Sequence, residues 1–208
     1  MRFERKYRIE NQPVSLVRQR LTENPANFTL AYPDRRVNSI YFDNAHFDAL
    51  NENFAGIGQR RKYRIRWYGE DLVNIRNPIL ETKIKVNKLG YKEYLKLEDF
   101  KIQELSLITR DIDIIRSRNL EPNVIISYDR TYFLSQDKIV RATIDRALSY
   151  HSLAVSRLEP LPSIDPAIIL EIKYDQSKES VAESYLQAIP FRLTKNSKYA
   201  SAVAKLWS

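Results

Sequence analysis

The chain has 208 residues, of which 43% are hydrophobic and 29% charged, with four glycines, so it can build a folded core and is not a disordered or collagen-like protein. It has no cysteine and two histidines, which excludes disulfides and thiolate chemistry and argues against a zinc site or a Ser-His-Asp triad. The 34 Lys and Arg residues against 26 Asp and Glu residues give a net charge of +8, which favours an anionic partner.

In the first half of the chain, alternation of apolar and charged residues predicts mainly strands. Between residues 2 and 9, for example, Phe3, Tyr7 and Ile9 alternate with charged side chains. The predicted strands cover residues 2–9, 37–43, 59–68, 79–86 and 91–98. A short helix is expected after Pro13, and a second over residues 45–54, ending near Gly56.

In the second half, apolar residues three and four positions apart predict a helix over residues 100–118. The remaining predicted strands are 123–133, 138–147 and 167–174, the predicted closing helices are 180–188 and 197–207, and residues 159–163 are expected to be a loop. No linker rich in Pro, Gly or Ser divides the chain, so we expect a single domain over residues 1–208.

The strand at residues 59–68 separates basic from apolar side chains. Alternation places one set on each face, namely Arg60, Lys62, Arg64 and Arg66 against Tyr63, Ile65 and Trp67. For one strand, the simple interpretation is a solvated basic stripe on a half-buried sheet. Repetition of the pattern is costly unless an anion lies among the cations, because like charges on neighbouring strands repel.

We therefore predict an α+β fold in which about eight antiparallel strands form a closed β-barrel with helices packed outside. Its interior would be a water-filled, anion-binding tunnel, because unpaired ions are costly to bury in a dry core. No Gly-x-Gly-x-x-Gly and no Gly-Lys-Ser/Thr sequence occurs, so Rossmann and P-loop phosphate sites are excluded. Taken alone, the pairs Glu81/Lys83 and Glu171/Lys173 are ordinary ion pairs, and Ser197 is an ordinary helix cap.

Eight short motifs in order resemble the VTC domain, the polyphosphate polymerase branch of the CYTH-like triphosphate tunnel superfamily. Each motif is weak alone, and the ordered series is specific. The motifs are Arg2-Phe3-Glu4-Arg5-Lys6, Ser39-Ile40-Tyr41-Phe42-Asp43-Asn44, Tyr63-Arg64-Ile65-Arg66-Trp67-Tyr68-Gly69, Leu80-Glu81-Thr82-Lys83, Tyr128-Asp129-Arg130, Val140-Arg141-Ala142-Thr143-Ile144-Asp145, Leu170-Glu171-Ile172-Lys173 and Lys195-Asn196-Ser197-Lys198-Tyr199.

The resemblance implies an enzyme that transfers the terminal phosphoryl group of ATP to a polyphosphate chain inside the tunnel and releases ADP. It implies a divalent metal, Mn²⁺ or Mg²⁺, with Glu171 and Glu4 as ligands. The cations that would act on phosphates in catalysis are Lys6, Arg64, Arg66, Lys83, Arg130, Arg141, Lys195 and Lys198. Substrate binding would use the same cations together with Lys92, Lys173 and Ser197.

One departure from the superfamily pattern bears on the reaction. Tunnel hydrolases and cyclases begin with Glu-x-Glu-x-Lys, and Arg2 stands at the first of these positions. Hydrolysis usually needs paired carboxylates to activate water, whereas a polyphosphate acceptor is already an anionic nucleophile. The pattern favours transfer. A tripolyphosphatase or nucleoside triphosphatase, and a non-catalytic module that binds polyphosphate or inositol phosphates, are the alternatives.

The chain has no run of roughly 18–20 apolar residues that would span a bilayer, and its first residues lack the apolar core of a signal peptide. We therefore expect a cytoplasmic protein that does not itself span a membrane, so that any membrane partner would be another chain. Nucleic acid is not expected as a partner, because the aromatic residues alternate to the face opposite the basic rows, which argues against a platform for stacking bases. The pattern does not exclude contacts with phosphates alone, so a simple nucleic-acid binder stays among the non-catalytic alternatives.

Overall fold

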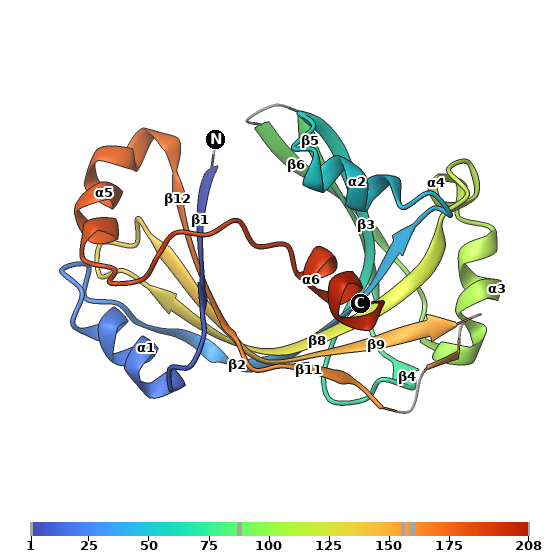
Figure 1. Ribbon diagram of the computed structural model, residues 1–208, viewed down its shortest axis with the longest axis horizontal. Coiled ribbons are helices and arrows are strands. Elements are labelled where there is room, and N and C mark those ends of the chain that lie inside the picture. Colours follow the sequence, from blue (N-terminus) through green and yellow to red (C-terminus); the bar gives the residue numbers. More distant parts are fainter. Residues whose placement is uncertain (1, 87–88, 155–156, 159–160, 208) are drawn as a thin grey trace. The chain divides into compact units, whose positions relative to one another are not determined.

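The computed structural model of the protein describes residues 2–86, 89–154, 157–158 and 161–207. It has an α+β fold with a mostly antiparallel sheet, as predicted (Figure 1). The strands are β1 (Arg2–Ile9), β2 (Thr29–Asp43), β3 (Gln59–Tyr68), β4 (Asn74–Ile75), β5 (Ile79–Val86), β6 (Leu89–Lys96), β7 (Phe100–Lys101), β8 (Glu121–Leu134), β9 (Arg141–Ala154), β10 (Arg157–Leu158), β11 (Ser163–Asp165) and β12 (Ile168–Asp175). The helices are α1 (Val14–Thr22), α2 (Asp48–Phe54), α3 (Leu105–Arg110), α4 (Asp113–Arg116), α5 (Glu179–Gln187) and α6 (Lys198–Leu206), with 3₁₀ turns η1 (Ile102–Glu104) and η2 (Gln176–Lys178).

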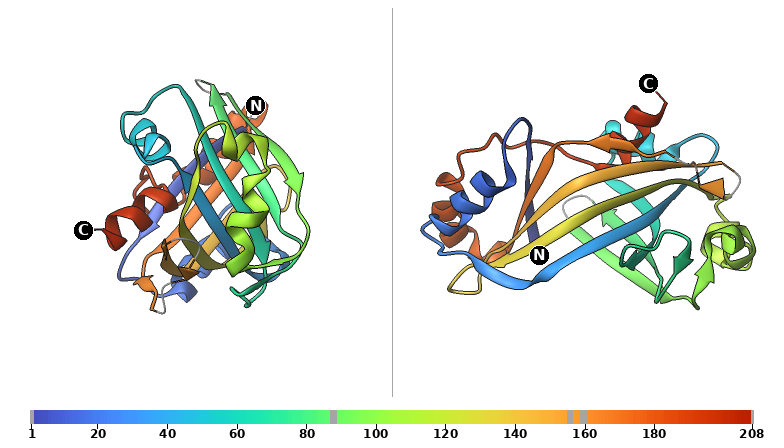
Figure 2. Two further views of the ribbon diagram at one scale, coloured as in Figure 1. Left: turned by 90° about the vertical axis from the view of Figure 1, so that its right-hand side faces the viewer. Right: turned by 90° about the horizontal axis from the view of Figure 1, so that it is seen from below.

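The strand order of the main sheet is β1-β12-β9-β8-β2-β3-β5-β6, and β10 and β11 pair with β9. Figure 2 shows β2, β8 and β9 as long neighbouring strands. The short strands β4 and β7 form a second sheet. Closure of the main sheet into a barrel stays a prediction.

The chain forms two compact units. Unit 1 comprises Met1–Arg35, Tyr128–Leu148 and Asp165–Asn196, and unit 2 comprises Arg36–Ser127, Ser149–Ile164 and Ser197–Ser208. Strands β2, β8 and β9 contribute residues to both units. The single domain predicted from the sequence therefore stays a prediction.

In unit 1, one face of the sheet is apolar and packs against helices. Leu170 of β12 and Ile144 of β9 lie opposite each other and are fully buried. They belong to one hydrophobic cluster with Leu21 of α1 and Ala182 of α5. Strand β12 lies between β1 and β9 with antiparallel pairing, so its alternate residues point to the other face. That face carries the charged residues.

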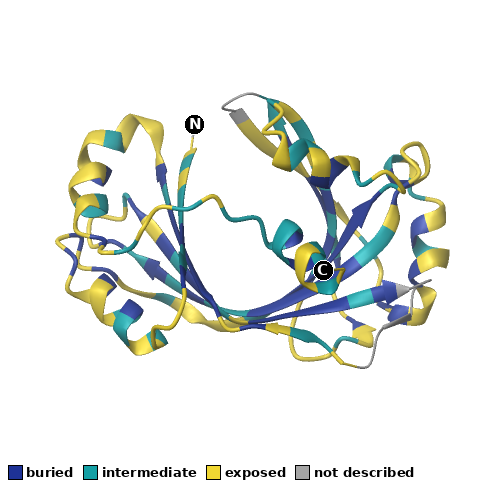
Figure 3. Ribbon diagram, viewed as in Figure 1, coloured by how far each residue is buried: buried dark blue, intermediate teal, exposed yellow. Residues whose placement is uncertain are grey.

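Unit 2 repeats this division. Ile65 of β3 pairs with Ile40 of β2 and with Leu80 of β5, and it is fully buried. These side chains share a cluster with Leu105 of α3 and Ile115 of α4. Figure 3 shows the buried positions along the strands and on the inner sides of the helices. Helices α3 and α4 thus cover the apolar face, and the basic side chains of β3 alternate to the opposite one.

Several boundaries differ from the predictions. The single helix predicted over residues 100–118 is wrong: this segment forms β7, η1, α3 and α4, because its first two residues pair with β4 and Ile112 takes an extended backbone conformation between α3 and α4. Strand β2 begins eight residues earlier than predicted and includes Pro33, and β9 continues to Ala154. Strand β6 begins and ends two residues early. The missed part of β2 is largely exposed, whereas the missed part of β9 is mostly buried, so alternation fails to mark it for a different reason.

Smaller differences concern helix α2 and the loop before β12. Helix α2 begins at Asp48, three residues later than predicted, after Phe47 in a left-handed conformation. Part of the predicted loop, residues 159–160, lies outside the described residues, and Ser163 begins the short strand β11. Among the residues that the structure describes, no helix combines the length and apolar character needed to cross a membrane.

Candidate functional site

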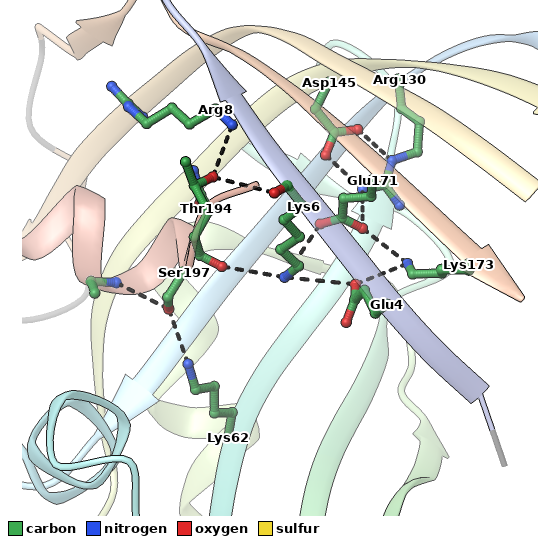
Figure 4. A network of polar contacts seen from close by, with 12 residues as sticks. Glu4, Lys6, Arg8, Lys62, Arg130, Asp145, Glu171, Lys173, Thr194 and Ser197 are labelled. Atoms are coloured by element: carbon green, nitrogen blue, oxygen red, sulfur yellow. Dashed lines mark hydrogen bonds and ion pairs between the residues drawn. The ribbon is translucent and has the colours of Figure 1, made fainter. Parts of the chain in front are cut away.

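On the charged face of unit 1, two lysines and two glutamates form a network that we call the Glu171 cluster, together with Arg130 and Asp145 (Figure 4). Lys6 Nζ lies 3.5 Å from Glu171 Oε1 and 3.6 Å from Glu4 Oε1. Lys173 Nζ lies 2.9 Å from Glu171 Oε2 and 3.3 Å from Glu4 Oε1. The antiparallel register of β1 and β12 causes this arrangement, because it places Lys6 opposite Glu171 and Glu4 opposite Lys173.

Arg130 of β8 extends this cluster toward β9. Its Nη2 donates to Asp145 Oδ2 at 2.7 Å and lies 3.8 Å from Glu171 Oε2. Burial alone would lower the pKa of Arg130, but Asp145 and Tyr128 outweigh it and raise the pKa. Burial likewise opposes the charge of Lys173, and Glu171 and Glu4 raise the pKa of that ammonium group. Both cations therefore remain charged, Arg130 in a largely buried position and Lys173 in a partly exposed one.

The segment before α6 runs along β1. The backbone N–H of Thr194 donates to the Lys6 carbonyl at 2.8 Å, and the Arg8 backbone N–H donates to the Thr194 hydroxyl at 3.0 Å. Lys6 Nζ also donates to the carbonyl oxygen of Asn196 at 3.3 Å. Lys195 lies in this segment and is exposed. The path of this segment is thus fixed by contacts of its backbone and of Thr194 with β1 rather than by Lys195.

Unit 2 carries a second group, the Glu81 cluster, made of Tyr41, Arg64, Arg66, Glu81 and Lys92. Arg64 Nε donates to Glu81 Oε2 at 2.7 Å, and Arg64 Nη1 donates to the Tyr41 hydroxyl at 2.9 Å. Arg66 Nη1 lies 3.8 Å from Glu81 Oε1, and Lys92 Nζ lies 3.6 Å from Glu81 Oε2. Arg64 and Glu81 meet because they are register partners on β3 and β5.

Three cations around one carboxylate leave the Glu81 cluster positive. Burial would raise the pKa of Glu81, but Arg64, Arg66 and Lys92 outweigh burial and hold this pKa at about 2. Burial and the charge of Arg64 lower the pKa of Lys92 to about 8, although Glu81 acts in the opposite direction. A bound polyanion would relieve this repulsion, which makes the cluster suited to phosphate groups.

Helix α6 begins beside β3 in the same unit. The Ser197 hydroxyl accepts a hydrogen bond from the backbone N–H of Ala200 at 3.4 Å, so the predicted cap is confirmed. Ser197 also accepts from Lys62 Nζ at 3.0 Å (Figure 4). Lys62 lies on the face of β3 that carries Arg64, and the next residue after the cap is Lys198. The N-terminal turn of α6 is therefore held by a lysine from the basic strand face.

The other predicted site residues are less enclosed. Lys83 pairs in register with both Lys62 and Lys92 and is exposed. Arg141 lies opposite Lys173 in the pairing of β9 with β12 and is also exposed. The structure thus places both on strands of the two clusters, and their action on phosphates stays a prediction.

Four residues that enter these networks were not among the predicted site residues: Tyr41, Lys62, Glu81 and Asp145. Tyr41, Glu81 and Asp145 stand in motifs used above for the resemblance, and alternation alone puts Lys62 beside Arg64. Their contacts depend on cross-strand register. A single sequence does not reveal which strands pair, so it gave no sign of these partners.

A divalent metal fits this site only in the company of substrate. Glu4 and Glu171 are the two carboxylates that the structure brings to the same pair of lysines. No group of three or more His, Cys, Asp and Glu side chains arranged for a metal occurs in the described part of the chain. Mg²⁺-type ions are commonly held by one or two carboxylates together with substrate phosphates and water, which matches this donor set.

Solved structures with the same fold come from distant proteins. The PH1819 protein from Pyrococcus horikoshii OT3 aligns with a TM-score of 0.58 and 12% identity, covering 99% of each chain. HpAC1 from Hippeastrum, a putative adenylyl cyclase described with a dominant triphosphatase activity, aligns with a TM-score of 0.54 and 13% identity over 98% of this chain and 96% of its own. These neighbours have the fold of CYTH-like triphosphate tunnel proteins.

The sequence itself identifies the family more closely. The family model of the VTC domain matches residues 1–207, and the chain belongs to this family. The resemblance predicted from the eight motifs is therefore confirmed. Members of this family and its CYTH-like relatives are enzymes of phosphoryl transfer or triphosphate hydrolysis, and the CYTH-like tunnel enzymes use divalent metals.

The low pKa of Glu81 predicts a defined loss of stability in acid. Its folded-state pKa is about 2 and its ordinary value is 4.5, so its stabilising charge is present above the ordinary value and is lost as the pH falls toward the folded one. At neutral pH, Glu81→Gln should lower the free energy of unfolding by about 3 kcal/mol. The difference from the unmodified protein should shrink as the pH falls. Urea unfolding over this pH range measures it.

The control for that measurement is Glu23→Gln, because Glu23 is half exposed and its carboxylate contacts Arg20 and Gln19 at the surface. It should change stability little at any of the pH values. A Glu81→Gln difference that stays constant across the acid range would contradict the assignment of the low pKa to this carboxyl.

Proposed function

We propose that the protein is an ATP-dependent polyphosphate polymerase, which transfers the terminal phosphoryl group of ATP to inorganic polyphosphate and releases ADP. Membership of the VTC family supports the proposal. The observation that carries it is that several cations from neighbouring strands surround one buried glutamate in each unit, Glu81 and Glu171. The closed basic tunnel predicted from the sequence is part of this proposal.

In the proposed reaction, a terminal oxygen of the polyphosphate chain attacks the γ-phosphorus of ATP. The new P–O bond forms as the bond from the γ-phosphorus to the bridging oxygen breaks, and ADP leaves with that oxygen. The acceptor is already an anion, so no proton has to be removed. Catalysis then consists of alignment and of neutralising the negative charge of two polyanions.

The cations of the two clusters suit that task. Arg64 and Arg66 present planar guanidinium groups, which bind phosphate oxygens in pairs, and Lys6 and Lys173 are point charges. When bound, the divalent metal would supply further positive charge to the phosphate oxygens, with Glu4 and Glu171 as its ligands. Its identity as Mn²⁺ or Mg²⁺ belongs to the proposal.

A tripolyphosphatase is the second candidate, supported by the paired carboxylates Glu4 and Glu171 and by the activity described for HpAC1. Hydrolysis needs a base that takes a proton from water. Each carboxylate of the Glu171 cluster already contacts Lys or Arg nitrogen atoms, as in the bond from Arg130 to Asp145. A carboxylate held in such ion pairs has to leave them before it can take a proton from water. This favours transfer over hydrolysis.

The two functions predict different products from the same incubation. Purified protein with ATP, a short polyphosphate primer and Mn²⁺ should form ADP and polyphosphate chains longer than the primer, with ADP formed in proportion to the phosphate added to chains. Gel electrophoresis of polyphosphate and chromatography of nucleotides measure both. Release of orthophosphate without chain growth, from ATP or from tripolyphosphate, would reject the polymerase and support the hydrolase.

A further inference from the structure

We propose that Tyr41 and Tyr199 are positioning residues, which hold the Arg64 guanidinium and the N-terminal turn of α6 in the arrangement that binds phosphates. The inference rests on the proposed function, since it deepens the account of the same site. It concerns residues of unit 2 alone. Neither tyrosine is expected to touch the reacting atoms.

Arg64 is held from two directions. Glu81 accepts from Arg64 Nε at 2.7 Å on one side, and the Tyr41 hydroxyl accepts from Nη1 at 2.9 Å on the other. The guanidinium carbon also lies 5.8 Å from the centre of the Tyr41 ring. A planar guanidinium with bonds at both ends cannot rotate without breaking one of them. Its orientation therefore depends on the Tyr41 hydroxyl as well as on the carboxylate.

The ring of Tyr41 stacks on a residue of α6. The ring centroids of Tyr41 and Tyr199 are 5.5 Å apart, and the ring planes are inclined by 9°. Tyr199 lies in the first turn of α6, directly after Lys198 and two residues after the cap Ser197. The stack thus fixes this turn against β2, the strand that carries Tyr41.

Tyr199 is itself anchored by a buried hydrogen bond. Its hydroxyl donates to Asp43 Oδ2 at 2.9 Å. Asp43 also accepts from the backbone N–H groups of Ala49 and Leu50 at 2.9 Å and 3.1 Å, which ties it to the start of α2. Burial and the Asp43 carboxylate raise the pKa of Tyr199, so its hydroxyl keeps its proton and the bond persists at ordinary pH.

The pKa of the Tyr41 hydroxyl also depends on the charges around it. Burial would raise the pKa of its hydroxyl, but Arg64, Arg66 and Lys198 outweigh burial and lower the pKa to about 8. These cations face Tyr41 from β3 and α6, while Tyr199 packs on its ring. A polyanion bound to the same cations would oppose them and raise the pKa again. Tyr41 ionisation is therefore a spectroscopic signal of anion binding at this position.

The test compares Tyr41→Phe and Tyr199→Phe with the control Tyr63→Phe. Both test variants keep the stacked rings and each removes one hydroxyl. Tyr63 lies on the apolar face of β3 and is buried, and its hydroxyl has no hydrogen-bond partner among the residues that the structure describes. Its loss should therefore not affect phosphate binding. Calorimetry gives the affinity for tripolyphosphate, thermal unfolding gives stability, and ultraviolet absorbance follows tyrosinate formation with pH.

Tyr41→Phe should weaken tripolyphosphate binding by about tenfold, the effect of one lost hydrogen bond to a charged group. It should raise KM for ATP with little change in kcat and abolish the tyrosinate transition near the pKa of Tyr41. In the unmodified protein, tripolyphosphate should shift this transition to higher pH. Tyr199→Phe should weaken binding about threefold and keep the transition. Absorbance follows tyrosinate alone, whereas the dependence of affinity on pH would also include Lys92, whose pKa lies in the same range as that of Tyr41.

The inference is overturned if Tyr41→Phe binds tripolyphosphate as tightly as Tyr63→Phe does, or if the transition persists in Tyr41→Phe. A change in melting temperature alone, without a change in affinity, would mean an ordinary core role and would also overturn it. If only the proposed polymerase function is wrong, tripolyphosphate will still bind and shift the tyrosinate transition of Tyr41, but incubation with ATP will not lengthen polyphosphate. If the unmodified protein does not bind tripolyphosphate, both are wrong.

Discussion

Replacing Glu171 by Gln should lower metal-dependent turnover of ATP by about a thousandfold, because the variant loses a metal ligand and keeps the side-chain volume. Tripolyphosphate affinity measured without metal should stay the same or increase. In the structure, Glu171 neutralises Lys6, Lys173 and Arg130, and removing its charge leaves these cations with more attraction for phosphate. Steady-state kinetics and calorimetry separate the two effects.

A suitable control is Glu179→Gln, because Glu179 is 39% exposed and lies 3.9 Å from Arg5 at the edge of unit 1. It should leave both turnover and affinity unchanged. The assignment of Glu171 to the metal would be contradicted by turnover that survives Glu171→Gln, or by a loss of tripolyphosphate affinity as large as the loss of turnover.

Replacing Arg64 by Ala should weaken tripolyphosphate binding by about a hundredfold, because each charge-assisted hydrogen bond contributes about 1.5–3 kcal/mol. Arg64→Ala alone also leaves Glu81 without its main partner, and breaking one side of a buried pair destabilises a fold by about 3–5 kcal/mol. The double variant Arg64→Ala/Glu81→Gln removes both charges and separates the loss of binding from the loss of stability.

Arg61→Ala is the matched control for this series, since Arg61 lies on β3 three residues away, on the opposite face, and is exposed. It should reduce affinity only slightly, through the loss of one screened surface charge. The affinity of Arg64→Lys for tripolyphosphate should lie between those of Arg61→Ala and the double variant, because lysine keeps the charge but lacks the planar guanidinium group. If Arg61→Ala and the double variant bind tripolyphosphate with equal affinity, the assignment of Arg64 to the phosphate site is contradicted.

The elements that the sequence predicts best are strands with one buried face. The segment that forms β3 reads clearly because Tyr63, Ile65 and Trp67 must all be buried on the same side, and its boundaries agree with the structure. The helix predicted over residues 100–118, after β6, is wrong because the spacing of apolar residues does not reveal where a helix is interrupted. Its apolar residues at helical spacing pack into or against the core, but the helix is interrupted, and spacing alone does not show the break at Ile112.

For the candidate site, the sequence predicts which face a charged residue occupies and the resemblance indicates which residues to examine. It does not predict their partners. Lys6 meets Glu171, and Arg64 meets Glu81, because of strand register over long separations in the chain. The same holds for the stack of Tyr41 on Tyr199, which joins residues from β2 and α6. Those contacts depend on the tertiary fold and became visible only in the structure.

The central claim is that these clusters bind linked phosphates, and calorimetric titration of the unmodified protein with tripolyphosphate tests it most directly. We expect saturable binding that weakens with added salt and is not displaced by single-stranded RNA of equal charge. Affinity should fall in variants of either cluster, Lys6→Ala or the Arg64 double variant. Absence of saturable binding, or displacement of tripolyphosphate by the RNA, would contradict the account.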